Sequence, residues 1–199
     1  MMVASDMSTL AAYDAKAEDF GAEWHDQPPP SDLHAAVREF FRPGPSADIG
    51  CGSGRDAAWL TANGFPCIGY DASEGLLAEA RRRYPTGTFV HSALPELSGI
   101  ADESFDNVLC ETVIMHLPSD AIAPSVRRML AILKPSGTMY LTWRVTTGAD
   151  RRDDNGRLYT AFDADIVRGA IGRASVLLDE ERVSASSGKI IHRIVARNI

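Results

Sequence analysis

The 199-residue chain contains only three cysteines, no long apolar run and no excess of basic residues. Cys51, Cys67 and Cys110 are an odd number and show no C-x-x-C spacing, which argues against a disulfide framework and favours structural thiols. No apolar stretch approaches the roughly 18 residues needed to cross a bilayer, so we predict no membrane partner. The five histidines show no H-x-x-x-H or similar pattern, so the sequence predicts no metal site.

Acidic residues outnumber basic ones. The chain has 27 Asp and Glu against 20 Lys and Arg, which gives a net charge of −7 at pH 7. Nucleic-acid binding draws much of its affinity from neutralised phosphates, so we expect no nucleic-acid partner. The first ten residues contain no basic region followed by an apolar core, so we expect no secretion signal and a cytoplasmic location. The length predicts a single domain over 1–199, as a monomer or a homodimer.

The most informative stretch is a glycine-rich segment that follows a short apolar run. It reads Asp48-Ile-Gly50-Cys-Gly52-Ser-Gly54 and precedes residues with helical spacing. Glycine lets the backbone turn tightly and approach a ligand closely, because it has no Cβ. Arg55 stands where the dinucleotide motif G-x-G-x-x-G has its third glycine, and Asp48 would repel a phosphate. The segment therefore favours a cationic or zwitterionic ligand over a dinucleotide.

A second carboxylate lies one predicted strand further along the chain. Asp71 ends the apolar run 65–70, 17 residues after Gly54. A carboxylate at the tip of a second strand accepts hydrogen bonds from ribose hydroxyls. The two features together predict a ligand that contains a nucleoside. The alternative is a plain glycine turn with a helix cap at Asp71.

These motifs resemble motifs I and II of the class I S-adenosylmethionine-dependent methyltransferases, and the resemblance extends from about residue 13 to residue 144. Tyr13–Phe20 resembles the Y-D-x-x-A-x-x-F/Y lead helix of small-molecule members related to the ubiquinone-biosynthesis and tellurite-resistance methyltransferases. Residues 104–110 resemble their fourth strand, and residues 130–137 resemble the L-x-P-G-G turn into the fifth. The resemblance implies S-adenosyl-L-methionine as the cofactor and a small molecule as the methyl acceptor.

Short apolar segments alternate with segments of helical spacing, which indicates βαβ units and a parallel sheet. Three prolines at 28–30 separate a predicted lid helix over 8–24, within an N-terminal segment 1–30, from a helix over 31–41. The number of strands matches the methyltransferase family, which implies a Rossmann-like α/β fold with helices on both faces and an antiparallel last strand. The predicted strands are 46–50, 66–70, 87–91, 105–110, 137–143, 174–179 and 190–196.

The resemblance also implies which residues contact the cofactor. The glycine segment with Asp48 is expected to hold the methionine end, Asp71 the ribose, and Ala72 the adenine edge. Ser92 stands where the family has the acid of a G-D-A-like triplet, so a hydrogen bond there lacks charge assistance. The full expected set is Tyr13, Asp48, Gly50, Cys51, Gly52, Gly54, Arg55, Asp71, Ala72, Ser92, Ala93 and Cys110.

Two residues are candidates for catalysis on the acceptor side. Glu111 follows the strand over 105–110, where many relatives carry Asn, and a carboxylate there could orient an amine or take a proton. A salt-bridged carboxylate at a strand end is the equally weighted alternative. His116 matches the second histidine of a V-L-H-H-L-P-like segment and titrates near neutral pH, although a structural role is favoured. Methyl transfer chiefly needs alignment of the reactants, so a base is optional.

A polar segment follows the fifth predicted strand. Residues 146–157 are too polar for the core, so we predict a substrate-side surface loop over 145–160. Arg144 ends the strand, and Tyr159 follows the loop. Arginine recognises carboxylate and phosphate through a planar fork, so we expect Arg144 and Tyr159 to contact an anionic acceptor. Arg151 and Arg152 are expected to pair with the aspartates at 150, 153 and 154 in a solvated turn.

Two other functions stay open at this point. The first is a methyltransferase that acts on protein or RNA, which the short and acidic chain disfavours. The second is a non-catalytic module that binds S-adenosylmethionine or a nucleoside, which an acceptor pocket sealed by large side chains would indicate. A nicotinamide-dependent oxidoreductase is disfavoured because the third glycine is absent.

Overall fold

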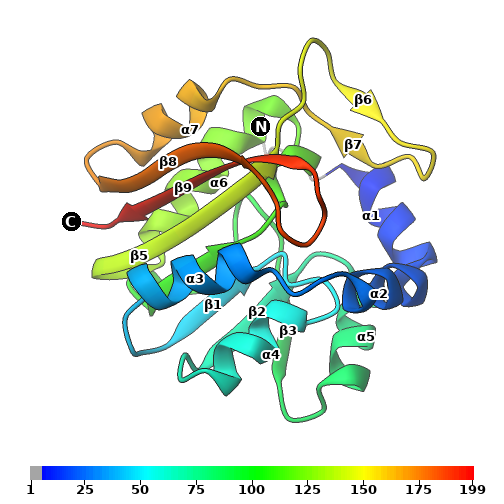
Figure 1. Ribbon diagram of the computed structural model, residues 1–199, viewed down its shortest axis with the longest axis horizontal. Coiled ribbons are helices and arrows are strands. Elements are labelled where there is room, and N and C mark those ends of the chain that lie inside the picture. The colour runs from blue at the N-terminus through cyan, green and yellow to red at the C-terminus, as the bar shows by residue number, and fades with distance from the viewer. Residues whose placement is uncertain (1–5) are drawn as a thin grey trace.

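A seven-stranded sheet forms the centre of the computed structural model, which describes residues 6–199 (Figure 1). Its strand order is β3-β2-β1-β4-β5-β9-β8. Strands β1 to β5 pair in parallel, and β9 is antiparallel to both β5 and β8, which confirms the predicted fold class. The strands are β1 (Ser46–Ile49), β2 (Cys67–Asp71), β3 (Thr88–His91), β4 (Phe105–Cys110), β5 (Leu133–Arg144), β8 (Ser175–Val183) and β9 (Ile190–Arg197).

Two strands are longer than the sequence predicts by three residues or more, namely β5 and β8. β5 begins at Leu133 because the Pro-Ser-Gly segment forms a bulge: Leu133 pairs with Phe105 and Thr138 with Asn107. The residues between Leu133 and Thr138 interrupt the hydrogen bonding between β4 and β5 locally, but they do not end the strand. β8 extends to Val183 through a polar stretch, since it lies at the edge of the sheet, where charged side chains reach water.

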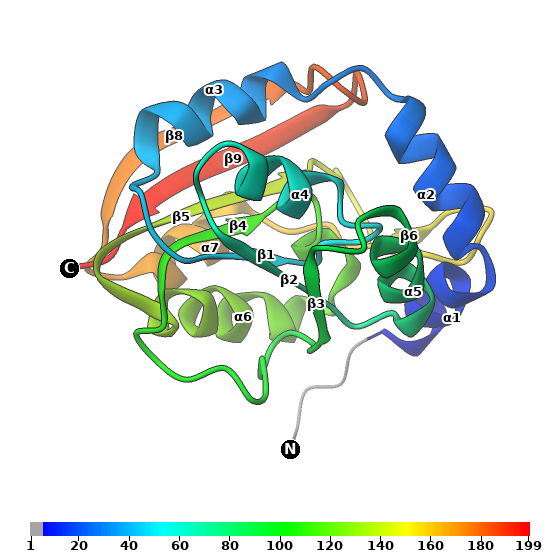
Figure 2. The same cartoon turned by 90° about the horizontal axis from the view of Figure 1, so that it is seen from below.

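Helices cover both faces of the sheet (Figure 2). Val108 and Leu109 are both fully buried, and they contribute to different apolar clusters because successive strand residues point to opposite faces. Val108 packs in the cluster with Ile122 of α6, and Leu109 in the cluster with Val37 of α3. The helices are α1 (Met7–Ala15), α2 (Ala17–Asp26), α3 (Ser31–Phe40), α4 (Arg55–Ala62), α5 (Glu74–Arg83), α6 (Ser119–Ala131) and α7 (Ala164–Ile171), with a short 3₁₀ helix η1 (Ile114–His116).

The predicted single lid helix over 8–24 is wrong, because two helices, α1 and α2, occupy this region and meet at Lys16. Lys16 has φ −129°, outside the helical range, yet the sequence around it contains no glycine or proline. The break is explained by docking on α5: the Asp14 carboxylate accepts hydrogen bonds from Ser73 Oγ at 2.6 Å and Gly75 N at 3.0 Å. Residues 1–5 of the predicted N-terminal segment lie outside the described residues.

The segment 145–160 is not only a loop, because it contains a small hairpin of β6 (Arg151–Arg152) and β7 (Leu158–Tyr159). Figure 1 shows this hairpin beside α1. Leu158 N donates to Thr9 Oγ1 at 2.9 Å, and Arg152 pairs with Asp6 at 2.6 Å. The hairpin and α1 therefore hold each other in place at one end of the sheet.

None of the helices within residues 6–199 is long and apolar enough to cross a membrane. The same residues contain no group of three or more His, Cys, Asp or Glu side chains placed to hold a metal ion.

The side chain of Asn107 in β4 holds the segment that leads into β1, so replacing it should lower the stability of the protein. Its side chain is fully buried, accepts from Arg42 N at 3.0 Å, and donates to Arg42 O and Ser46 Oγ. Asn107→Ala leaves these groups unpaired, so we expect the free energy of unfolding to fall by about 1–3 kcal/mol. Urea denaturation measures this. The exposed Asn63→Ala should change stability much less, and equal effects would contradict the assignment.

Candidate active site

A cavity opens at the carboxyl ends of β1, β2, β4 and β5, bounded on its outer side by residues of α1 and α2. The carboxyl ends of parallel strands are where open α/β sheets bind ligands. Most residues predicted for the site line this cavity: Tyr13, Gly50, Cys51, Gly52, Arg55, Asp71, Ala72, Ser92, Ala93, Glu111, His116, Arg144 and Tyr159.

Three residues predicted to contact the cofactor do not line the cavity: Asp48, Gly54 and Cys110. Asp48 and Cys110 are buried inside β1 and β4, with 2% and 0% of their surface exposed. Gly54 precedes α4, and a Cβ there would lie 2.7 Å from the Phe89 ring. Gly54 thus permits close packing of the loop against Phe89, and a direct contact of these three residues with the cofactor stays a prediction.

The first two glycines shape the wall of the cavity. Gly50 and Gly52 have φ values of 75° and 53°, in the left-handed region that glycine adopts at little cost. A Cβ at Gly50 would overlap Val113, and one at Gly52 would lie 2.8 Å from the Trp24 ring of α2. Only glycine therefore allows this backbone to approach both Val113 and the lid.

Asp71 holds the glycine loop from the neighbouring strand. Its Oδ2 accepts from Gly52 N and its Oδ1 from Ser73 N, both at 2.8 Å. The side chain of Asp71 is buried, with 9% of its surface exposed. Burial raises the pKa of Asp71, and the backbone hydrogen bonds oppose that rise. Each carboxylate oxygen keeps a second lone pair, so Asp71 can still accept a bond from a ligand hydroxyl.

The end of the cavity near the glycine loop is acidic. Asp48 lies behind the loop, and its Oδ2 is buried without a hydrogen-bond partner in the described chain. Burial, and then the charges of Asp56 and Asp71, hold the pKa of Asp48 well above its ordinary value. Arg55 pairs with Asp56 at 3.0 Å and donates to Trp24 O, which connects α4 to the lid. A positively charged ligand would relieve the repulsion among these carboxylates.

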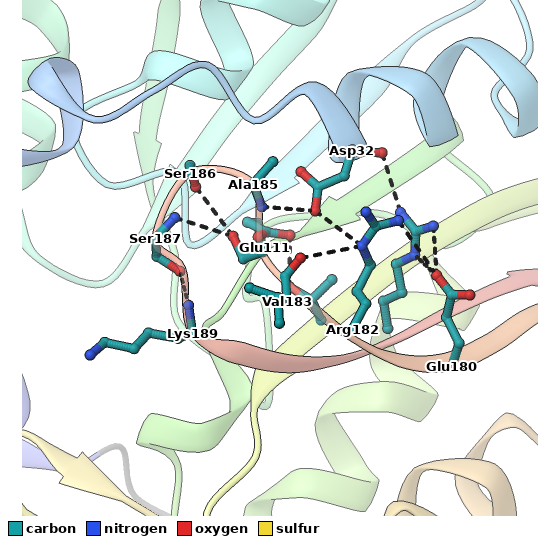
Figure 3. Close-up of polar contacts among 12 residues, drawn as sticks. Asp32, Glu111, Glu180, Arg182, Val183, Ala185, Ser186, Ser187 and Lys189 are labelled. Atoms are coloured by element: carbon teal, nitrogen blue, oxygen red, sulfur yellow. Dashed lines mark hydrogen bonds and ion pairs between the residues drawn. The ribbon is translucent and has the colours of Figure 1, made fainter.

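Glu111 lies further along the cavity, at the end of β4. Thr142 Oγ1 of β5 donates to its Oε2 at 2.7 Å. Burial raises the pKa of Glu111 to about 7, and the Thr142 hydrogen bond only partly opposes this. Figure 3 shows Glu111 among Asp32 of α3 and residues of the β8–β9 turn over 184–189. A carboxyl group with this pKa exchanges a proton near neutral pH.

His116 occupies the opposite wall and bridges three segments. Its Nδ1 contacts Leu158 O at 2.5 Å, and its Nε2 contacts Tyr13 Oη of the lid at 3.0 Å. Donation from Nδ1 to the carbonyl leaves Nε2 to accept from the tyrosine hydroxyl. Burial, together with the charges of Arg157 and Arg144, lowers the pKa of His116 to about 4, although the hydrogen bond to Leu158 O opposes this shift. His116 is therefore neutral and both its ring nitrogens are engaged.

Several residues that line the cavity were not predicted from the sequence. Ser184, Ser186 and Ser187 come from the β8–β9 turn, Trp24 from α2, and Arg157 from the segment before β7. Ala185 N of the turn donates to Asp32 Oδ2 at 3.3 Å, which seats the turn against α3 (Figure 3). A serine-rich turn gives no local signal of function, so only the tertiary structure reveals its position.

Residues 47–141 match the family model described as a methyltransferase domain. A trans-aconitate 2-methyltransferase of Methylobacterium nodulans is 35% identical over 107 residues, covering 52% of this chain and 40% of the relative. Over residues 47–141 the chain is therefore similar to methyltransferase domains. The cavity lies mainly between elements inside this matched range, whereas α1, α2 and the β8–β9 turn lie outside it.

Solved structures show the same fold over nearly the whole chain. The 1,6-didemethyltoxoflavin-N1-methyltransferase of Burkholderia thailandensis, solved with S-adenosylhomocysteine, has a TM-score of 0.72 and 24% identity. The match covers 96% of this chain and 87% of that one. A structure named as the [4+2]-cyclase SpnF has a TM-score of 0.73 at 15% identity and covers 100% of this chain and 98% of its own. At these identities the likeness shows the fold alone.

The chain spans 40% to 49% of the length of the curated relatives it matches. The match to the family model ends at residue 141, inside β5. Arg144 and Tyr159, the two residues predicted to contact the acceptor, follow that range.

The raised pKa of Glu111 should appear in the pH dependence of the protein's stability. Its folded-state pKa of about 7 exceeds its ordinary value of 4.5, so the folded state loses stability as the pH rises between these values. In Glu111→Gln the side-chain amide oxygen can still accept the hydrogen bond from Thr142. The variant has no carboxyl group at this position, so it does not lose stability in this way as the pH rises. We therefore expect the variant to gain stability relative to the parent between pH 5 and pH 8, by about 2 kcal/mol.

Urea denaturation at the two pH values tests this expectation. The matched control is Glu96→Gln, because Glu96 is exposed and its side chain makes no hydrogen bond in the structure. A parallel pH dependence of Glu111→Gln and the parent protein would show that Glu111 titrates normally.

Proposed function

We propose that this protein transfers a methyl group from S-adenosylmethionine to a small-molecule acceptor. The observation that carries the proposal is one continuous cavity, which runs from the glycine loop and Asp71 to Glu111, His116 and Arg144. A cofactor pocket that opens directly onto the side chains of Glu111 and Arg144 fits an enzyme better than a closed binding module. The residues present also fit the cofactor, because the loop can be approached closely and its surroundings are acidic.

The roles of the residues follow from their places in the cavity. Asp71 accepts hydrogen bonds from the ribose hydroxyls, and the glycine loop holds the methionine part. S-adenosylmethionine supplies an activated methyl group on a positively charged sulfur, so the protein mainly has to align the acceptor with it. Tyr13 of α1 and Trp24 of α2 line the outer side of the cavity.

Glu111 is the proposed proton acceptor, in preference to His116. The pKa of Glu111 is raised to about 7, so a large fraction of it is ionised at neutral pH and available to take a proton from the acceptor. His116 has a pKa of about 4 and both nitrogens engaged, which suits a positioning role that joins the lid to η1. This assignment follows from the hydrogen bonds and not from the residue types, which would favour histidine.

The first test is ligand binding. Isothermal calorimetry of the purified protein should detect S-adenosylmethionine and S-adenosylhomocysteine but not NAD, because Arg55 replaces a third glycine and the carboxylates repel a pyrophosphate. Incubation with methyl-labelled donor and a metabolite extract should then yield a labelled small molecule. Binding of NAD without binding of either S-adenosyl compound would overturn the proposal.

Binding without transfer to any metabolite would favour the alternative of a non-catalytic module. Labelling of protein or RNA, and not of a small molecule, would favour the other alternative.

Asp71 should dominate cofactor affinity. Asp71→Ala removes the acceptor for the ribose and also the hydrogen bond from Gly52 N that shapes the loop. We expect S-adenosylhomocysteine to bind about 1.5–3 kcal/mol more weakly, as measured by calorimetry. The control is Asp120→Ala, which removes an exposed carboxylate at the start of α6, away from the cavity. An unchanged dissociation constant for Asp71→Ala would mean that the ribose binds elsewhere.

A further inference from the structure

Three guanidinium groups surround Tyr159 of β7, at the acceptor end of the cavity. The guanidinium carbons of Arg144, Arg151 and Arg157 lie 5.9, 5.6 and 5.9 Å from the centre of its ring. Tyr159 itself is 5% exposed, so its ring is a fixed platform for these cations. Stacking of this kind orients a guanidinium but does not neutralise its charge.

Two of these cations lack a counter-charge. Arg157 pairs with Asp153 at 2.7 Å, so its charge is balanced. Arg144 and Arg151 make no side-chain hydrogen bond and no ion pair with any residue in the range 6–199. The Nε of Arg144 is buried without an acceptor, which is costly for a charged donor. The expected pairing of Arg151 and Arg152 with neighbouring aspartates is wrong, because Arg152 pairs with Asp6 and Arg151 stacks on Tyr159.

Arg144 stands where two hollows meet. It lines the main cavity, and it also lines an adjoining pocket together with Arg151 and with Lys189 of the β8–β9 turn. The one carboxylate of that pocket within the described chain is Asp153, which Arg157 already binds. This pocket is therefore positively charged in a protein whose net charge is −7. Figure 3 shows Lys189 on the β8–β9 turn.

We propose that Arg144 and Arg151 bind an anionic group of the methyl acceptor, either a carboxylate or a phosphate. The inference rests on the proposed function and names the class of its substrate. A planar guanidinium donates two parallel hydrogen bonds to such an anion, and the terminal nitrogens of Arg144 make no hydrogen bond within residues 6–199. The anion lies at the junction of the two hollows, and the rest of the acceptor extends toward Glu111.

The acidic and basic ends of the combined site also set the orientation of the acceptor. Carboxylates near the glycine loop repel an anion, whereas Arg144 and Arg151 attract it. An acceptor with one anionic group thus enters with that group away from the cofactor loop. Neutral analogues of the same size lack this preference.

Succinate and inorganic phosphate are the probes for the test, titrated by calorimetry into protein saturated with S-adenosylhomocysteine. At least one probe should bind the parent protein, and the one that binds more tightly identifies the anion. Arg144→Gln should weaken this binding about tenfold or more, and Arg151→Gln should weaken it less because that side chain is exposed. Arg144→Lys keeps the charge but loses the fork, so an intermediate affinity is expected.

The matched control is Arg82→Gln, which removes an equal charge from the exposed face of α5. It should bind the probe as the parent protein does. Absence of binding by both probes, or an equal loss in Arg82→Gln and Arg144→Gln, would overturn the inference. Thermal unfolding of each variant shows whether it is folded. If Arg144→Gln does not fold, Arg151→Gln still tests the site.

Binding of S-adenosylhomocysteine in the same experiment separates the two proposals. If it does not bind, the proposed methyltransferase function fails. If it binds but neither anion does, only the anionic acceptor fails. In a turnover assay, Arg144→Gln should raise KM for the anionic acceptor about tenfold or more, while kcat changes much less. The reason is that Arg144 binds a part of the acceptor that is distant from the reacting atoms.

Discussion

The Asp71 carboxylate is the interaction on which the site depends. Its two oxygens accept from Gly52 N of the glycine loop and from Ser73 N at the start of α5. Ser73 Oγ then donates to Asp14 of the lid. One buried carboxylate thus joins the loop, the second strand, α5 and the lid. Because such an acceptor is costly to leave unpaired, these segments are fixed relative to one another before any ligand binds.

The same site separates charges of opposite sign. The loop end contains the carboxyl groups of Asp48 and Asp71, whereas the acceptor end carries Arg144 and Arg151 beside Tyr159, without a counter-charge within residues 6–199. Glu111 lies between these ends and keeps a pKa of about 7, since burial disfavours its charged form. The field therefore attracts a positively charged cofactor at one end and an anionic group at the other.

Closure of the site relies on contacts between distant parts of the chain. The lid residue Tyr13 meets His116 of η1, and Thr9 and Asp6 meet the β6–β7 hairpin through Leu158 and Arg152. The β8–β9 turn completes the wall from the other edge. Each contact involves only a few atoms. Together they place α1, the β6–β7 hairpin and the β8–β9 turn around one cavity.

The sequence by itself determined the sheet, its order of elements and the cofactor loop. Apolar runs such as 105–110 and the glycines between Asp48 and Arg55 are local signals, because strand burial and tight turns depend on neighbouring residues. The tertiary structure alone decided the break at Lys16, the burial of Asp71, the pairing of Arg152 with Asp6 and the place of the Ser184–Ser187 turn. Arg152 and Asp6 are 146 residues apart, and no local pattern encodes a charge pair or a packed surface formed over that separation.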